Sequence, residues 1–375
     1  MPAGTALRST LVAAALVAGT IAVCLLAGEG LCRLAGYRGL EQYRPDRALG
    51  WIPTPGQTTA TRVGALPVQI DADGFRAAPL EQPKASGTIR IFALGASTTF
   101  GWGVRQDDTY EQVLERMLND TARAQGTGVR YEVVNAGVIG FNLRQAARDM
   151  ARIARRYEPD GFLVAYTFND AWNRFGTPGA PSLGRVLAGV RAKNLLRRSA
   201  LYNWLVDLLA RRRYEAAAAR GPGFAALTQT GDGPVSARDL ATFHATLDTL
   251  LALGRTAHAS LGFIVPAARD QGAPWPRQRE MVSFAADARL PLLDLVSTHP
   301  QGYGDSLYLP LDAVHPTAQG HGLIARLLYA ELCRAAAEAE SGADAIYRAG
   351  CRAPPREPGP KKLRARPRIG DAPGK

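Results

Sequence analysis

Ser97 stands where a short apolar run meets a turn, and a serine in such a place could act as a nucleophile. The run from Ile89 to Val104 reads I-R-I-F-A-L-G-A-S-T-T-F-G-W-G-V. Its alternation, stopped by Gly95, predicts a buried strand of an α/β sheet. Open α/β sheets bind their ligands at the carboxyl ends of the strands. The alternative is a tight turn whose Ser and Thr only cap a helix, and residues elsewhere must decide between the two.

Three later stretches carry residue types that a serine nucleophile needs. They read N-A-G-V-I-G from Asn135 to Gly140, T-F-N-D from Thr167 to Asp170, and D-A-V-H-P from Asp312 to Pro316. Together with G-A-S-T-T, these stretches resemble the four sequence blocks of the SGNH, or GDSL-type, hydrolase superfamily. The resemblance spans about residues 88–335. Each block alone is a weak signal, whereas four in the right order are a strong one.

The resemblance implies a catalytic triad and an oxyanion hole. Carried over by motif, the triad falls on Ser97, Asp312 and His315, and the oxyanion donors are Ser97, Gly140 and Asn169. Gly140 is preferred to Gly137 because the oxyanion glycine of the family usually closes a stretch of this kind. The resemblance implies neither a metal nor a cofactor.

Two residues depart from the family pattern. Ala96 stands where the family name has Asp, and Thr167 stands where the third block usually has Gly. Neither is a proposed catalytic residue. The departures concern the hydrogen bonds and the loop geometry behind the site.

The chemistry of acyl transfer explains why these residue types belong together. A neutral Ser hydroxyl is a poor nucleophile and needs a base within hydrogen-bond reach. His315 can take the Ser97 proton and return it to the leaving alcohol, while Asp312 fixes the tautomer of the imidazole and stabilises the imidazolium. Backbone N–H groups and a side-chain amide suit the charge that develops on the carbonyl oxygen.

Strand and helix patterns alternate along the body of the chain. After the strand at Ile89, strands are expected at 130–135, 161–167, 260–266 and 290–295. Helices are expected from about Tyr110, with Asp107 or Asp108 as N-cap, and over 145–157. Such alternation predicts a three-layer α/β/α fold with a five-stranded parallel sheet. This is the flavodoxin-like arrangement that the resemblance also implies, with the candidate residues on one rim.

Composition divides the chain into four parts. Residues 1–37 hold an uncharged apolar segment, and residues 38–87 are expected to form a small β-rich preface. Residues 88–351 correspond to the hydrolase domain that the resemblance implies, and residues 352–375 are expected to form a disordered basic, Pro-rich tail. The segment from Leu11 to Gly28 spans about 27 Å as a helix, just enough to cross a bilayer. It is either a membrane anchor or a cleaved signal peptide. The resemblance favours a single-pass membrane protein with its body outside the cytoplasm, in the periplasm.

An insertion of about 171–235 interrupts the alternation. Within it, Ser199 can cap a helix in which Leu201, Trp204, Leu205 and Leu208 share one face, with Arg211 to Arg213 following. An amphipathic basic helix of this kind could lie on an anionic membrane surface or act as a lid. The alternative is a helix packed on the body with solvated arginines.

The net charge of +12 is concentrated in two segments. Residues 185–220 carry nine basic and two acidic side chains, and residues 352–375 carry eight and two. The rest of the chain is nearly neutral, which argues against a nucleic-acid-binding face.

Cysteine and histidine residues give few further signals. Cys333 and Cys351 flank the end of the last expected helix, and an extracytoplasmic location would permit them to pair. Of the five histidines, only His315 lies in a motif. The remaining four are expected at the surface or in the core: His244, His258, His299 and His321.

These observations favour a serine esterase that hydrolyses the O-acyl group of an envelope glycan or lipid. One alternative keeps the triad but transfers the acyl group to a polysaccharide hydroxyl. Another is a catalytically silent carbohydrate-binding protein. The expected partners are an acylated substrate and the membrane, without a cofactor.

Overall fold

The computed structural model describes residues 3–39, 41–56, 58–60, 67–177, 179–218, 235–269, 271–298, 305–310, 312–339 and 343–351. The predicted tail at 352–375, as well as His299, lies outside the described residues.

Five parallel strands form the central sheet. They are β5 (Thr88–Gly95), β6 (Arg130–Gly137), β7 (Gly161–Ala165), β8 (Ser260–Val265) and β9 (Leu292–Asp294). Their order is β6-β5-β7-β8-β9 and every pairing is parallel. Numbered along the chain, this is the 2-1-3-4-5 order of flavodoxin-like sheets. The predicted fold class is therefore confirmed, although β7 and β9 are shorter than expected.

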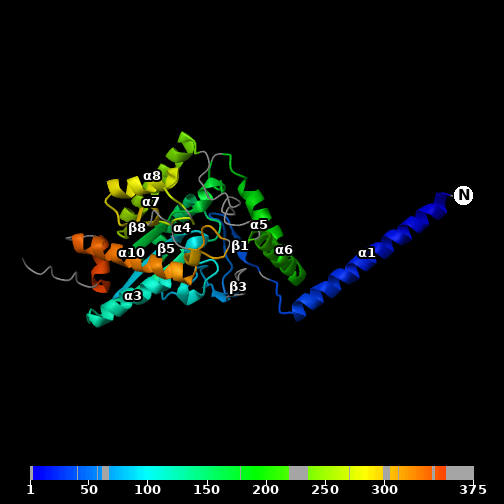
Figure 1. Cartoon of the computed structure of the whole chain (residues 1–375), viewed down its shortest axis with the longest axis horizontal. Coiled ribbons are helices and arrows are strands. Elements are labelled where there is room, and N and C mark those ends of the chain that lie inside the picture. The colour runs from blue at the N-terminus through cyan, green and yellow to red at the C-terminus, as the bar shows by residue number, and fades with distance from the viewer. Residues whose placement is uncertain are drawn as a thin grey trace, which may run out of the picture.

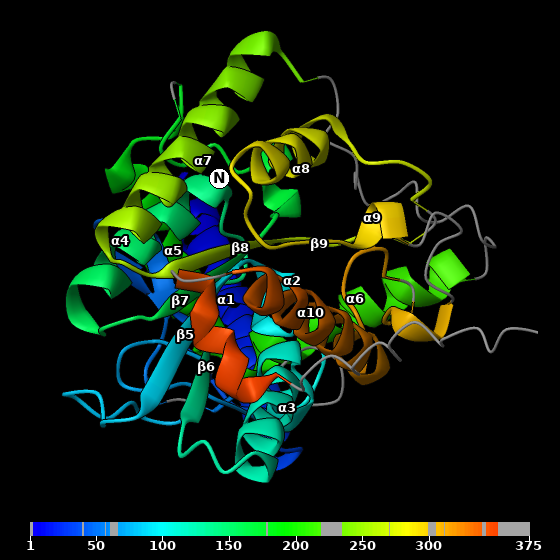
Figure 2. The same cartoon turned by 90° about the vertical axis from the view of Figure 1, so that its left-hand side faces the viewer.

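Helices cover both faces of the sheet (Figure 2). One face carries α3 (Tyr110–Ala124) and α10 (Ala318–Glu338), and the other carries α4 (Leu143–Arg156), α7 (Ala237–Thr256) and α8 (Pro276–Asp287). Every residue of β7 and of β8 is buried. This double burial explains why both strands read as continuous apolar runs instead of alternating ones.

The start of α3 differs from the prediction. Asp107 and Asp108 belong to a short 3-10 helix, η1 (Gln106–Asp108), and Thr109 is the N-cap. The Thr109 hydroxyl donates to the carbonyl of Gln106 at 3.2 Å instead of accepting from the helix. The 3-10 turn therefore occupies the residues that were expected to cap α3.

The N-terminal part combines a long helix with two small sheets. Helix α1 (Ala3–Leu34) projects away from the body (Figure 1). Its stretch from Thr10 to Leu34 has a mean hydropathy of 2.5 and is long and apolar enough to cross a membrane, a test that a signal sequence also passes. Two antiparallel pairs follow, namely β1 (Tyr43–Asp46) with β2 (Gly50–Pro53), and β3 (Thr58–Ala60) with β4 (Pro67–Gln69).

The described part of the insertion consists of two helices, α5 (Leu183–Arg197) and α6 (Ala200–Ala218). The Ser199 hydroxyl accepts from the N–H of Tyr202 at 3.0 Å, as predicted for a cap. Taken as a whole, the stretch Ala200–Leu209 of α6 is apolar, and the four residues predicted to share an apolar face all lie within it: Leu201, Trp204, Leu205 and Leu208. Its polarity changes along the axis, with arginines following at 211–213.

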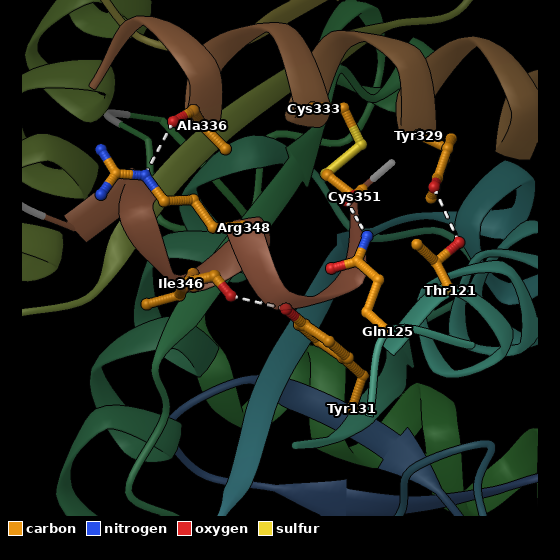
Figure 3. Close-up of a disulfide and its surroundings, with 9 residues drawn as sticks. All are labelled: Thr121, Gln125, Tyr131, Tyr329, Cys333, Ala336, Ile346, Arg348 and Cys351. Atoms are coloured by element: carbon orange, nitrogen blue, oxygen red, sulfur yellow. Dashed lines mark hydrogen bonds between the residues drawn. A yellow bond between two sulfur atoms is a disulfide. The ribbon is translucent and has the colours of Figure 1, made fainter. Parts of the chain in front are cut away.

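A disulfide joins the end of α10 to the last described segment, as predicted. Cys333 and Cys351 are bonded, and the 3-10 segment η5 (Ala343–Gly350) lies between them (Figure 3). Tyr131 donates to the carbonyl of Ile346 at 2.7 Å, and Gln125 donates to that of Cys351 at 2.6 Å. The segment is thereby held against β6 and the end of α3.

Candidate active site

Ser97, His315 and Asp312 form one chain of hydrogen bonds. His315 Nε2 lies 2.7 Å from Ser97 Oγ, and His315 Nδ1 lies 2.7 Å from Asp312 Oδ2. Since an ionised carboxylate only accepts, Nδ1 carries the proton and Nε2 is left to accept from the serine hydroxyl. The sequence separates Ser97 from His315 by 218 residues, and the fold brings them into contact.

The loop between β9 and α10 fixes the His315 backbone through Asp312. Asp312 Oδ1 accepts from the N–H groups of Val314 and His315 at 2.8 and 2.9 Å. Burial raises the pKa of the Asp312 carboxyl, but the hydrogen bond and charge of His315 and these two N–H groups outweigh burial and leave the pKa below its ordinary value. Asp312 is therefore ionised at neutral pH and suited to stabilise an imidazolium.

The turn that carries Ser97 is held from beneath by a buried arginine. Ser97 opens the one-turn helix α2 (Ser97–Phe100) directly after β5. Arg76 Nη1 donates to the carbonyls of Phe100 and Gly101 at 2.6 and 2.7 Å, and Nη2 donates to that of Val104 at 2.8 Å. Gly101 has φ +77°, and a Cβ there would lie 2.6 Å from Thr109 Cγ2, so the turn requires glycine.

The two glycines of the second block have different surroundings. The N–H of Gly137 donates to Asn135 Oδ1 at 3.0 Å, and a Cβ on Gly137 would lie 2.4 Å from the N of Phe100. Gly140 has φ +86°, and its N–H donates to no described residue. Gly137 thus serves packing beside the serine turn, whereas Gly140 retains an unused donor.

Asn169 lies at the end of β7, in the 3-10 helix η2 (Phe168–Ala171). Its Nδ2 donates to the carbonyl of Phe141 at 2.8 Å, which joins it to the Gly140 loop and leaves its second amide hydrogen available. Strands β5, β6 and β7 are direct neighbours in the sheet. Their carboxyl ends therefore bring Ser97, Gly140 and Asn169 to one edge, while the role of each as an oxyanion donor stays a prediction.

Both departures from the family pattern are accommodated. Ala96 is buried, and its carbonyl accepts from the N–H of Phe100 at 2.8 Å. The Thr167 hydroxyl donates to Asp170 Oδ2, and both Asp170 oxygens accept from the N–H of Leu143 at 3.2 Å. Thr167 thus helps to orient the carboxylate that ties η2 to the first turn of α4.

Sequence reasoning missed a buried polar cluster behind the serine turn. Its members Arg76, Glu111 and His321 are all at most 1% exposed. His321 Nδ1 accepts from the N–H of Tyr110 at 3.1 Å, and burial, followed by the charges of Arg76 and His315, lowers its pKa to about 3. The Gly-Phe-Arg motif at 74–76 was the available signal for Arg76.

Glu111 carries an unusual carboxyl within that cluster. Both of its oxygens are buried without a well-aligned hydrogen bond from a described residue. Burial raises its pKa to about 8, against the lowering effects of its own backbone N–H, the Arg76 charge and the nearby Tyr110 and Thr109 hydroxyls. Burial also lowers the pKa of Arg76, to about 10. In the described part of the chain, no three His, Cys, Asp or Glu side chains form a group that could hold a metal ion.

No family model matches the chain, and no curated protein matches it. Among solved structures, the chain is similar to the psychrotrophic esterase EstA from Pseudoalteromonas sp., with 15% identity, 65% of this chain and 97% of that chain covered, and a TM-score of 0.38. It is similar to a lipolytic protein of the G-D-S-L family from Desulfitobacterium hafniense, with 15% identity, coverage of 66% and 98%, and a TM-score of 0.37.

A third similar structure is a two-domain esterase active on acetylated mannans. The identity is 14% and the TM-score 0.40, with 68% of this chain covered. The match covers 51% of that protein, so the chain spans about half of its length. At identities this low, neither activity nor substrate carries over from one protein to another.

Proposed function

We propose that the protein is a serine esterase of the SGNH type that forms an acyl-enzyme at Ser97. The observation that carries the proposal is the continuous chain from Ser97 Oγ through His315 to Asp312, with both hydrogen bonds at 2.7 Å. A base within hydrogen-bond reach, itself oriented by a third group, is the arrangement that activates a serine hydroxyl.

The proposed reaction has two halves. His315 Nε2 takes the Ser97 proton as Oγ attacks the ester carbonyl, and the tetrahedral intermediate then expels the alcohol, which receives that proton. Water next attacks the acyl-enzyme, His315 takes its proton, and the acid is released as Ser97 recovers its hydrogen. The N–H groups of Ser97 and Gly140 and the amide of Asn169 are the proposed donors to the oxyanion.

The proposed substrate is an O-acyl group on an envelope glycan or lipid. Two tryptophans beside the site support this class. Trp102 has its ring centroid 6.3 Å from that of His315, and Trp172, three residues after Asn169, is 62% exposed. The exposed Trp172 ring and the half-buried Trp102 ring offer flat apolar faces to a sugar ring or an acyl chain.

We further propose that α1 is an anchor and that the body lies outside the cytoplasm, in the periplasm. The length and hydropathy of the Thr10–Leu34 stretch support a membrane span. A disulfide within the body is compatible with an oxidising compartment. Purification of the chain from membranes, followed by N-terminal sequencing, distinguishes a retained anchor from a cleaved signal peptide.

The full chain in detergent, incubated with p-nitrophenyl esters of increasing chain length and with acetylated glycans, tests the esterase proposal. Release of acid, abolished in Ser97→Ala, is the expected result. Transfer of the acyl group to an added polysaccharide without release of acid would favour the transferase alternative. Binding of glycans without turnover or labelling of Ser97 would favour the silent binder.

A further inference from the structure

We propose that α5 and α6 form a surface that rests on the membrane crossed by α1 and binds anionic phospholipid headgroups. This inference rests on the proposed anchoring by α1. It gives the insertion a function separate from the chemistry at Ser97.

The contact between α1 and α6 fixes the depth of α6 relative to the possible membrane span. Glu29 of α1 accepts from the Ser199 hydroxyl at 2.7 Å and from the N–H groups of Ala200 and Leu201 at 3.0 Å each. Glu29 lies five residues before Leu34, the end of the possible span, which is about 8 Å at 1.5 Å per residue. If α1 crosses the bilayer, the first turn of α6 therefore lies at the level of the headgroups.

The helices also touch directly at this point. A Cβ on Gly28 would lie 3.2 Å from Leu201 Cδ2, so the glycine permits the close approach. Asn203 Nδ2 donates to the carbonyl of Arg38 at 2.9 Å, just beyond α1. In Figures 1 and 2, α6 runs crosswise to α1, beside its C-terminal end. A helix held crosswise to a membrane span lies along the membrane surface.

Large apolar side chains are exposed on both helices of this surface. They are Leu195 (66%), Leu196 (52%), Trp204 (38%), Leu205 (43%) and Leu209 (51%). Exposed apolar side chains that gather in one region mark an interaction site, and Trp is enriched at membrane interfaces. Helix α1, which contacts the start of α6, also exposes its apolar side chains, and this favours lipid as the occupant of both.

Basic side chains predominate on this surface. Residues 183–218 carry eight basic and two acidic side chains, and Arg185, Arg191, Arg211 and Arg212 are exposed. A cavity of about 530 Å³ at the junction with α1 is lined by Arg33, Tyr37, Arg38, Gly39, Glu41 and Arg198. Within it, Arg33 pairs with Glu29 and Arg198 with Glu41, while Arg38 is exposed. Clustered basic residues beside a membrane span attract anionic headgroups. Charge complementarity therefore selects anionic lipid over a second, equally basic copy of the chain.

The test uses the full chain in nanodiscs of phosphatidylcholine, with or without phosphatidylglycerol. An environment-sensitive fluorophore is attached at Leu205→Cys, with Cys24 and Cys32 replaced by Ser. Asp120→Cys on α3 is the matched control, because that side chain is 72% exposed. Helix α3 lies far from α1 (Figure 1). Native Cys24, labelled in a Cys32→Ser chain, reports separately whether α1 is inserted.

Quenching of the Leu205 label by a quencher carried on the lipid headgroup is expected, with no quenching at Asp120. The combined change Arg211→Gln and Arg212→Gln should lower the contact equilibrium about fivefold per arginine, only in phosphatidylglycerol discs. Quenching at Cys24 without quenching at Leu205 overturns this inference, while the proposal that α1 is a membrane anchor still stands. A blue-shifted Leu205 label that lipid does not quench also overturns it, since protein then covers the patch. Absence of quenching at Cys24 overturns both proposals, and equal contact in both lipids overturns the anionic preference.

Discussion

The carboxyl edge of the sheet and the α5–α6 pair differ in what holds them in place. At the sheet edge, buried donors and acceptors within the chain fix each loop, as Arg76 does for the serine turn and Asp170 for η2. The α5–α6 pair leaves large apolar side chains exposed and is joined to α1 through Glu29. Contacts within the described chain fix the sheet edge, whereas the α5–α6 pair has exposed apolar side chains that the proposed membrane contact would cover.

This difference separates two kinds of function. A reaction centre needs preorganised groups, because misplacement by about 1 Å can cost about 10²-fold in rate. A membrane-binding surface needs exposed apolar area and charge instead. Changes at the sheet edge should therefore affect rate strongly, and changes on α5–α6 should not.

The largest expected effect comes from His315→Ala. It should lower kcat by about 10⁴ to 10⁶-fold, and combining it with Ser97→Ala should be little worse, because triad members act as a unit. His244→Ala is the matched control. His244, an exposed residue of α7, also contacts a carboxylate, that of Glu280, so kcat should not change. An equal loss of kcat in His315→Ala and His244→Ala would contradict a specific catalytic role for His315.

Asn169→Ala should have a smaller effect on rate. Loss of one oxyanion donor costs about 2.7 to 4 kcal/mol, which lowers kcat by about 10² to 10³-fold. Asn194→Ala on α5 also removes a hydrogen bond from a side-chain amide to a carbonyl, that of Tyr43, and should leave kcat unchanged. Steady-state kinetics on a soluble ester measure both. An Asn169→Ala enzyme with normal kcat would remove this residue from the oxyanion hole.

Reduction of the disulfide should affect stability without affecting the geometry of the site. Cys333 and Cys351 are 18 residues apart, and closing such a loop contributes about 3 kcal/mol in the chain-entropy model. Thermal melting with and without reductant measures the effect. A Cys24→Ala, Cys32→Ala chain retains the bond and should lose as much stability on reduction as the native chain. Unchanged melting of the native chain would contradict the prediction.

A pH dependence of the stability is expected from Glu111. Its pKa rises from 4.5 to about 8 on folding, so in this window the folded state keeps a proton that the unfolded state has lost. The contribution of Glu111 to stability therefore falls as pH rises from about 4.5 to about 8. The melting temperature of Glu111→Gln, relative to that of the native chain, should therefore rise as pH increases. A constant difference between pH 5 and pH 8 would count against it.

The fold could be predicted because local patterns determine it, and Ser97, Asp312 and His315 could be proposed as a triad because their motifs resemble the blocks of a known family. The apolar runs specify strands buried on both faces, and the spacing within D-A-V-H-P places Asp312 and His315 within one turn. The polar cluster of Arg76, Glu111 and His321 could not be predicted. Its members lie far apart in sequence and meet only through tertiary packing.

The contact between Glu29 and α6 was likewise beyond the sequence. A boundary at residue 37 was expected from composition, yet the contact joins residues 170 to 172 positions apart across it. Composition indicates whether a segment prefers water or a membrane. It does not indicate which distant helix N-terminus a carboxylate will cap.

Labelling of the full chain with a fluorophosphonate, followed by peptide mapping, is the most direct test of whether Ser97 is a nucleophile activated by His315. The reagent reacts only with a serine that a neighbouring base activates. We predict that Ser97 is the one labelled residue. Labelling should be lost in Ser97→Ala, nearly lost in His315→Ala, and slowed but detectable in Asn169→Ala. Label on another serine, or equal labelling of the native chain and His315→Ala, would contradict it.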